Sequence, residues 1–141
     1  MAAVKVESPK KTLIVGATDN PSRYAYTAAG MLADRGIDFI PIGIKKGSVF
    51  GKEILDLKAK PDLQHIHTIT LYIGASHQPE WIPYLLGLNP KRIIFNPGTE
   101  NPDFIAQARA AGIEALTACN LVMLTTCLLY TSPSPRDRTR S

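Results

Sequence analysis

The sequence lacks any long apolar run: none approaches the roughly 18–20 apolar residues that a membrane-spanning helix needs. Its beginning, MAAVKVESPKK, is polar and has no apolar segment of the kind that directs secretion. Cysteine is scarce, with only Cys119 and Cys127, which is too few for a disulfide framework. These absences predict a cytoplasmic protein with no membrane partner.

Recognisable catalytic motifs are also missing. There is no G-x-S-x-G nucleophile motif, and no cysteine has a histidine partner identifiable from sequence. His65 and His67 would share one face of a strand, but no third metal ligand is nearby, and His77 is isolated. Cys119 is better explained as a small buried thiol than as a nucleophile. We therefore expect no catalytic residues, no enzyme activity and no metal.

The basic charge comes in large part from the last residues. The formal net charge is +4, and residues 127–141, CLLYTSPSPRDRTRS, contribute three arginines and one aspartate, or +2. The remaining +2 does not favour a nucleic-acid partner. The same segment resembles translated sequencing-adapter read-through and has no periodicity. We expect residues 127–141 to be a non-native disordered tail, and residues 1–10 to be disordered as well.

Residues 11–126 show what the chain does have, a regular alternation of short apolar runs and helical patterns. Short strands separated by helices predict an α/β fold: a Rossmann-like, doubly wound parallel sheet of about five strands with helices on both faces. Residues 45–63 are expected to form a polar loop. The predicted strands are 11–15, 39–42, 68–73, 92–95 and 113–118, and the predicted helices are 22–35, one from about 79, and one from 102 that ends at Gly112.

The loop after the first predicted strand, GATDNPSR from Gly16 to Arg23, has the form of a phosphate-binding loop. Ligands of such sheets bind beyond the carboxyl ends of the strands, where helix N-termini favour anions. Gly16 lets a ligand approach the backbone, but the second and third glycines of the dinucleotide motif are absent. Thr18 and Asn20 can bond either a phosphate or the loop itself, and Arg23 adds positive charge. A tight turn with no ligand is the alternative.

The end of the second predicted strand has Lys45 and Lys46 where NAD-binding folds place an acid for the ribose. Two lysines suit an additional phosphate on an adenosine ribose. NADP has one at the 2′ position and coenzyme A has one at the 3′ position. The alternative is a solvated basic turn.

Two further loops should lie on the same edge of the sheet. Gly74 begins one of them and has little bulk, so it can border a ligand groove; the alternative is ordinary helix capping by Ser76. Asn96 and Thr99 lie in the other, where they can bond the amides of a pantetheine arm; the alternative is a Pro-Gly turn at Gly98 fixed by the asparagine.

At these residues the chain resembles a known family, the small single-domain CoA-binding proteins of the YccU-like group. The resemblance covers roughly residues 11–124 and implies a Rossmann-like domain related to the CoA-binding domain of succinyl-CoA synthetase α-subunits. The motifs that carry it are VGATDNPSRYAY, PIGIKK, VFG, TLYIG, KRIIFNPGTEN and ACNLVML.

The resemblance implies which residues contact the cofactor. Gly16, Ala17, Thr18, Asn20 and Arg23 fall on the phosphate loop. The adenosine end with its 3′-phosphate falls near Pro41, Lys45 and Lys46; Gly74 lies on the next wall, and the pantetheine side falls near Asn96 and Gly98.

The predicted function is binding of coenzyme A or an acyl-CoA without catalysis. The ligase relatives use a phosphorylated histidine in a separate domain, so the resemblance implies no ligase chemistry here. An NADP-dependent oxidoreductase is one alternative, with Tyr24 or Tyr72 as proton donor. A non-catalytic subunit docked on an acyl-CoA enzyme is another, for which an exposed apolar patch near Trp81 and Tyr84 would be expected. A homo-oligomer is also open.

Overall fold

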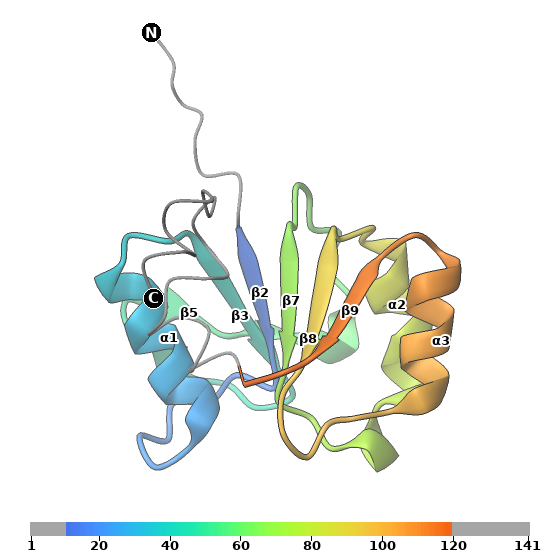
Figure 1. Ribbon diagram of the computed structural model, residues 1–141. Coiled ribbons are helices and arrows are strands. Elements are labelled where there is room, and N and C mark those ends of the chain that lie inside the picture. The colour runs from blue at the N-terminus through green and yellow to red at the C-terminus, as the bar shows by residue number, and fades with distance from the viewer. Residues whose placement is uncertain (1–10, 120–141) are drawn as a thin grey trace, which may run out of the picture.

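The computed structural model describes residues 11–119, which form a parallel sheet with helices on both faces (Figure 1). The sheet has six strands in the order β6-β3-β2-β7-β8-β9, and all of its strand pairs are parallel. This confirms the predicted α/β fold, with six strands rather than about five. In chain order the strands are β2 (Thr12–Val15), β3 (Phe39–Gly43), β6 (Leu55–Asp56), β7 (Thr68–Leu71), β8 (Arg92–Phe95) and β9 (Glu114–Thr117).

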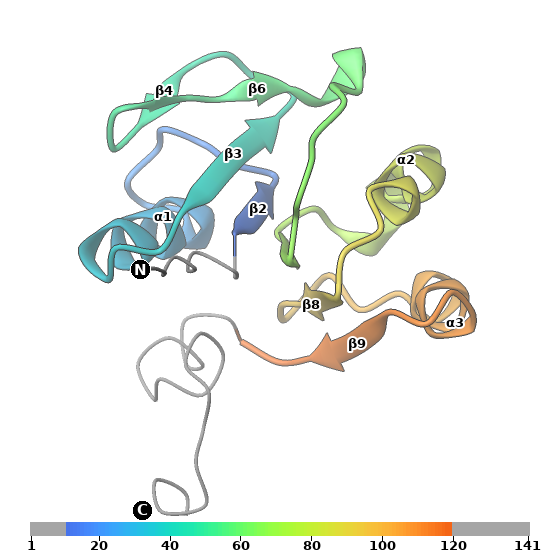
Figure 2. The same ribbon diagram turned by 90° about the horizontal axis from the view of Figure 1, so that it is seen from above.

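Helices cover the two faces of the sheet unequally. Helix α1 (Tyr24–Asp34) lies on one face, and α2 (Ile82–Gly87) and α3 (Pro102–Ala110) lie on the other (Figure 2). The helix expected from about residue 79 begins as two short 3-10 turns, η2 (Ala75–His77) and η3 (Pro79–Trp81), and becomes α-helical only at Ile82. Two prolines in this stretch, which cannot donate backbone hydrogen bonds, account for the irregular start.

The alternation of side chains along β2 produces two cores. Leu13 and Val15 pack on the side of α2 and α3, and Ile14 packs against α1 on the other side. Phe95 and Phe104 meet edge to face at 5.2 Å between ring centroids and join β8 to α3. A parallel sheet buried on both faces explains why its strands read as continuous apolar runs.

Residues 45–63 were expected to form a polar loop, but they also contain regular structure. They contain the antiparallel pair β4 (Ser48–Val49) and β5 (Lys52–Glu53), the edge strand β6, and the 3-10 turn η1 (Leu57–Ala59). Phe50 and Gly51 form the hairpin turn, both with positive φ, as a two-residue turn that suits the strand twist requires. Strands of two residues have no visible period, so the sequence pattern did not reveal them.

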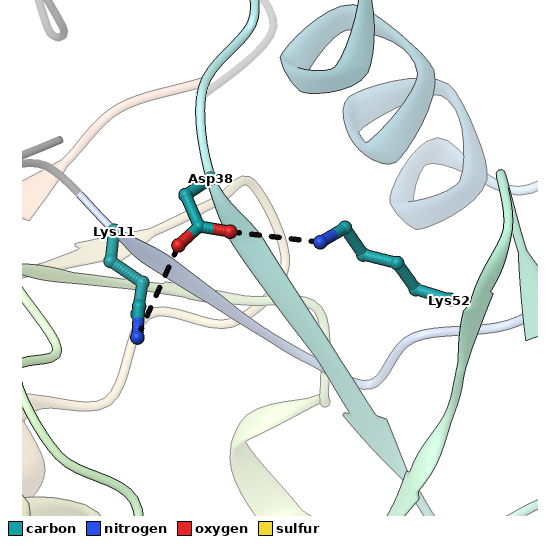
Figure 3. A network of polar contacts seen from close by, with 3 residues as sticks. All are labelled: Lys11, Asp38 and Lys52. Atoms are coloured by element: carbon teal, nitrogen blue, oxygen red, sulfur yellow. Dashed lines mark ion pairs between the residues drawn. The ribbon is translucent and has the colours of Figure 1, made fainter.

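A small ionic network joins this hairpin to the sheet (Figure 3). The Asp38 carboxylate lies 3.6 Å from Lys52 Nζ in β5 and 4.0 Å from Lys11 Nζ, just before β2. Lys52 Nζ also lies 5.0 Å from the centre of the Phe39 ring. These groups lie at the amino ends of β2 and β3, so the network is on the opposite edge of the sheet from the predicted binding loops.

At the majority of element ends, the observed boundary differs from the predicted one by one to three residues. Gly36 ends α1 with a φ of +67°, and its N–H donates to the Ala33 carbonyl, as expected of a left-handed helix end. The predictions for residues 1–10, for the last residues of the domain (120–126) and for the tail (127–141) fall outside the described residues.

Candidate ligand-binding site

The order of strands changes direction between β2 and β7, which lie side by side in the middle of the sheet. From β2 the chain moves outward to β3 and β6; it then returns to β7 and moves outward the other way to β8 and β9. The loops after β2, β3, β7 and β8 all leave from the carboxyl ends of parallel strands, at the lower edge of the sheet in Figure 1. This is the edge where open α/β sheets bind ligands.

Gly16 begins the first loop with a φ of +96°, and a Cβ at this position would lie 3.1 Å from the backbone carbon of Tyr72. The N–H groups of Gly16 and Ala17 both donate to the Ile42 carbonyl, at 2.9 and 3.0 Å. These two amides are therefore engaged with β3. The glycine is required by the backbone conformation and by the close passage of β7, in addition to any approach by a ligand.

The side chains of Thr18 and Asn20 bond the loop itself. Thr18 Oγ1 accepts from the Asn20 N–H at 3.1 Å, and Asn20 Oδ1 accepts from the N–H and hydroxyl of Ser22 at 3.0 and 2.8 Å. Of the two roles that the sequence allowed for these residues, the structure shows the second. These bonds fix the path of the loop into α1.

The N-terminus of α1 has no side-chain cap from any residue that the structure describes. Arg23 occupies the N-cap position with an extended backbone and is exposed, and the first turn contains no acidic residue. The first N–H groups of a helix need partners from outside the helix, and the helix dipole favours an anion there. An uncapped start beside an arginine is a suitable place for a phosphate group.

The loop after β3 presents both predicted lysines to solvent. Lys45 and Lys46 are exposed, and neither forms an ion pair with another of residues 11–119. Ile44, directly before them, is 59% exposed. Two cations and one apolar side chain are thus available next to the first loop, as an adenosine with an extra phosphate requires.

Pro41 is placed differently from the lysines that accompany it in the sequence motif. It is buried inside β3, opposite Ile14 of β2. Strand β6 pairs with β3 only at Ile42 and Gly43, so at Pro41 the strand has a neighbour on one side and the missing N–H is tolerated. Pro41 therefore shapes the strand, and its ring is not on the exposed surface that the lysines form.

The loop after β2 comes close to the last residue of β3 and to the loop after β3. Each close approach is possible because the residue there is a glycine and has no side chain. A Cβ on Gly43 would lie 2.8 Å from the Ala17 carbonyl oxygen, and a Cβ on Gly47 would lie 2.6 Å from Asp19 Oδ2. No local pattern indicates the second contact, because Asp19 and Gly47 belong to different loops.

On the other side of the switch point, Gln78 joins two loops. It is 1% exposed, and its Nε2 donates to the Ile73 and Thr99 carbonyls, both at 2.8 Å. Its Oε1 accepts from Asn101 Nδ2 at 3.1 Å, while Asn101 Oδ1 caps α3 by accepting from the N–H groups of Asp103 and Phe104. This residue could not be found from the sequence, since a glutamine in a loop carries no pattern that indicates burial.

Asn96 and Thr99 have internal roles in the loop after β8. Asn96 is 3% exposed, and its Nδ2 donates to Thr70 Oγ1 and to the Leu71 carbonyl, both at 2.7 Å. Thr99 Oγ1 donates to the Asn96 carbonyl at 2.8 Å. Both N–H bonds of the Asn96 amide are used within the protein. The structure thus favours the turn fixed by asparagine over a direct bond from this amide to a ligand.

Two glycines lie on the surface formed by these loops. Gly74 is partly exposed, and apart from Gly74 and its two chain neighbours no described residue has an atom within 4 Å of a Cβ built on it. Gly98 is exposed with a φ of +93°, and its N–H donates to Glu100 Oε1 at 2.9 Å. The surface at Gly74, beside the switch point, therefore has open space next to it, as a ligand groove requires.

The remaining candidate residues lie elsewhere. His65 and His67 line a cavity of about 570 Å³ at the amino edge of the sheet, together with Lys91. Within residues 11–119, no three His, Cys, Asp or Glu side chains are grouped so that they could hold a metal ion. His77 is exposed on η2, and Cys119 is a partly exposed free thiol after β9.

Trp81 and Tyr84, at α2, do not form the exposed patch that would favour the docking hypothesis. Trp81 is 7% exposed and belongs to the core. The Tyr84 hydroxyl donates to the Pro61 carbonyl, and its pKa is raised, first by burial and then by the nearby Asp62 carboxylate. These two residues therefore give no support to docking at this face.

Comparison with known proteins identifies the family. The profile of the CoA binding domain family matches residues 10–125. The chain belongs to this family. No protein of curated function matches the chain.

Several solved structures resemble this CoA binding domain. One, described only as an uncharacterized protein, is 47% identical, with a TM-score of 0.81 over 84% of this chain and 96% of its own. A hypothetical protein from Pyrococcus horikoshii OT3 is 22% identical, with a TM-score of 0.72 over 85% of this chain and 84% of its own. A protein from Thermus thermophilus has the same identity and TM-score over 85% and 90%. The last two likenesses support the fold alone.

The helices within residues 11–119 are all short. Among the residues that the structure describes, none is long and apolar enough to cross a membrane.

Proposed function

We propose that this CoA binding domain binds coenzyme A or an acyl-CoA across the carboxyl edge of the sheet, and that it has no catalytic activity of its own. The observation that carries the proposal is a pair of features on adjacent loops, each suited to bind an anion. One is the uncapped N-terminus of α1 beside Arg23, and the other is the exposed pair Lys45 and Lys46. Coenzyme A has a pyrophosphate and a separate 3′-phosphate, so it needs two such sites.

The neighbouring surfaces suit the remaining parts of the molecule. Ile44 and Tyr24 are 59% and 74% exposed and lie at the ends of the same two loops, where an adenine ring needs apolar contact. The open space at Gly74 adjoins the rigid loop pair held by Gln78, and it offers a path for the pantetheine arm. In this arrangement Gly98, rather than the Asn96 side chain, borders the arm.

Binding without catalysis is supported by the side chains at this edge. Tyr24, one of the two proton donors named for a reductase, is on the surface with no enclosure. Tyr72 is partly buried between the first loop and β7. The NADP-dependent oxidoreductase therefore has less support than the CoA-binding domain, and so does the docked subunit, since Trp81 is buried.

The experiment is isothermal titration of the full chain with coenzyme A, with dephospho-CoA and with NADPH. We expect saturable binding of coenzyme A, weaker binding of dephospho-CoA because it lacks the 3′-phosphate, and no comparable binding of NADPH. Absence of binding by coenzyme A and by short acyl-CoAs in the low-millimolar range would overturn the proposal. Binding of NADPH in preference to coenzyme A would favour the reductase instead.

A further inference from the structure

The fold places the carboxylate of Asp19 close to the residues that follow β3, where the sequence has lysines in place of an acid. After β3, where dinucleotide-binding folds place an acid for the ribose hydroxyls, this chain has Lys45 and Lys46. Asp19 reaches this region from the loop after β2. Its Oδ2 lies 2.6 Å from the point that a Cβ on Gly47 would occupy, so the carboxylate rests directly on the Gly47 backbone.

The course of the backbone holds Asp19 there. Two residues before it, the Ala17 carbonyl packs on Gly43, and the Ala17 N–H donates to the Ile42 carbonyl at 3.0 Å. One residue after it, Asn20 bonds back to Thr18 and forward to Ser22. Asp19 is thus fixed on both sides, and its position does not depend on a bond from its own side chain.

The Asp19 carboxylate remains available for a ligand. It is exposed, and it makes no hydrogen bond or ion pair with another residue in the described range 11–119. The lysines that follow β3 are exposed and unpaired within the same range. A carboxylate accepts hydrogen bonds from hydroxyl groups and repels phosphates, whereas an ammonium group attracts phosphates.

We propose that Asp19 is a specificity-determining residue, which accepts a hydrogen bond from the ribose 2′-hydroxyl while Lys45 and Lys46 hold the 3′-phosphate. This inference rests on the CoA binding proposed above. It adds which of two isomers the site selects. An adenosine nucleotide with a 3′-phosphate and a free 2′-hydroxyl is accepted. One with a 2′-phosphate is rejected, because that phosphate would meet the Asp19 carboxylate.

The test uses two small isomers, adenosine 3′,5′-bisphosphate and adenosine 2′,5′-bisphosphate, each titrated into the full chain and each used to displace coenzyme A. We expect the wild-type protein to prefer the 3′ isomer by about tenfold or more, which is the size of a charge-assisted hydrogen bond. Asp19→Asn should lower this ratio of affinities, because it weakens binding of the 3′ isomer and strengthens binding of the 2′ isomer. An effect of opposite sign on the two isomers is not expected from general loss of structure.

Two further variants make the result specific. Asp34→Asn removes the same charge from the exposed last residue of α1, and it should leave the ratio unchanged. Gly47→Ala keeps every charge but puts a methyl group 2.6 Å from Asp19 Oδ2, at a backbone φ of +154° that also strains alanine, so it should displace the carboxylate and narrow the ratio as Asp19→Asn does. Thermal unfolding of each variant verifies that it is folded.

The outcomes separate this inference from the function on which it rests. If the wild type binds coenzyme A but does not distinguish the two isomers, or prefers the 2′ isomer, the role of Asp19 is refuted and CoA binding stands. An unchanged ratio in Asp19→Asn, or an equal change in Asp34→Asn, also refutes it. If neither coenzyme A nor either isomer binds the wild type, the proposed function fails and this inference fails with it.

Discussion

Gly16 and Gly74 follow the neighbouring strands β2 and β7, but the protein depends on them for different reasons. Gly16 has a φ of +96° and passes 3.1 Å from the Tyr72 backbone, measured from a built Cβ. Gly74 has an ordinary φ of −58°, and its surroundings are open within the described chain. The first glycine therefore serves the fold, whereas the second leaves room next to it.

Gly16→Ala should lower the free energy of unfolding by about 1–3 kcal/mol, because alanine is strained at this φ and its methyl group meets β7. Gly74→Ala should leave the free energy of unfolding within about 1 kcal/mol of the wild type. Urea denaturation of the two variants measures both values. A wild-type midpoint for Gly16→Ala would show that the loop relaxes freely and that the glycine is not needed there.

Gly74→Leu tests the wall of the proposed groove without the backbone strain and close contact that a side chain meets at Gly16. The side chain meets no described protein atom near its Cβ, so the fold should be retained while coenzyme A binds at least about tenfold more weakly. Isothermal titration measures the affinity, and Gly87→Leu, a second glycine with open surroundings, at the end of α2, is the control. Equal affinity in Gly74→Leu and the wild type would remove this wall from the site.

Lys45 and Lys46 are expected to contribute through charge alone, since both are exposed. Replacing both by alanine should weaken coenzyme A by about 1–3 kcal/mol, and it should weaken dephospho-CoA much less. Lys91→Ala removes a charge at the opposite edge of the sheet and should change neither affinity. If the double variant binds both ligands as the wild type does, the two lysines form only a solvated turn.

The Tyr84 hydroxyl predicts a dependence of stability on alkaline pH. Its pKa is raised in the folded protein, by burial first and by Asp62 second, so the folded state holds this proton more tightly than the unfolded state. The stabilisation is complete below the ordinary tyrosine pKa near 10 and is lost as pH rises through the higher folded value. The difference in unfolding free energy between the wild type and Tyr84→Phe should therefore shrink between pH 8 and pH 11. A constant difference would contradict this.

At the scale of elements, the loops after β7 and β8 behave as one unit because of a single buried side chain. Gln78 bonds the Ile73 and Thr99 carbonyls, and through Asn101 it is connected to the start of α3. Three elements are thus held by one amide that is almost fully buried. The pantetheine side of the proposed site is therefore formed before any ligand binds.

Gln78→Leu should cost about 1–3 kcal/mol of unfolding free energy, because buried carbonyl groups lose their donors. Asn101→Ser keeps a side-chain oxygen that can cap α3 and loses the donor to Gln78 without adding a charge, so it should cost less. Chemical denaturation measures both. A smaller loss in Gln78→Leu than in Asn101→Ser would contradict the network as described.

At the scale of the whole molecule, periodic elements could be predicted from the sequence and isolated contacts could not. The apolar runs at β2, β3, β7 and β8 were located because these strands are almost wholly buried, and β9 was located although its two end residues are exposed. Strands β4, β5 and β6 were missed because two residues give no period. The four site loops were predicted on one edge because the carboxyl ends of parallel strands must coincide.

The individual side chains of the site were harder to predict. Lys45 and Lys46 are exposed as expected, since a charged pair after a strand faces solvent by default. Asn96 was expected to face a ligand but is buried with its amide donors engaged, and the contact of Asp19 with Gly47 was not foreseen. Both depend on where the chain passes in three dimensions, which local pattern does not encode.

The most direct test of the central claim, that coenzyme A lies across the carboxyl edge of the sheet, is an amide chemical-shift titration of the full chain with coenzyme A. The shifted signals should belong to the loops after β2, β3, β7 and β8, with the strongest changes at Thr18–Tyr24 and Ile44–Gly47. Signals from the amino edge, such as His65 and Lys91, should not move. Shifts that cluster at the amino edge, or no shifts at millimolar coenzyme A, would contradict it.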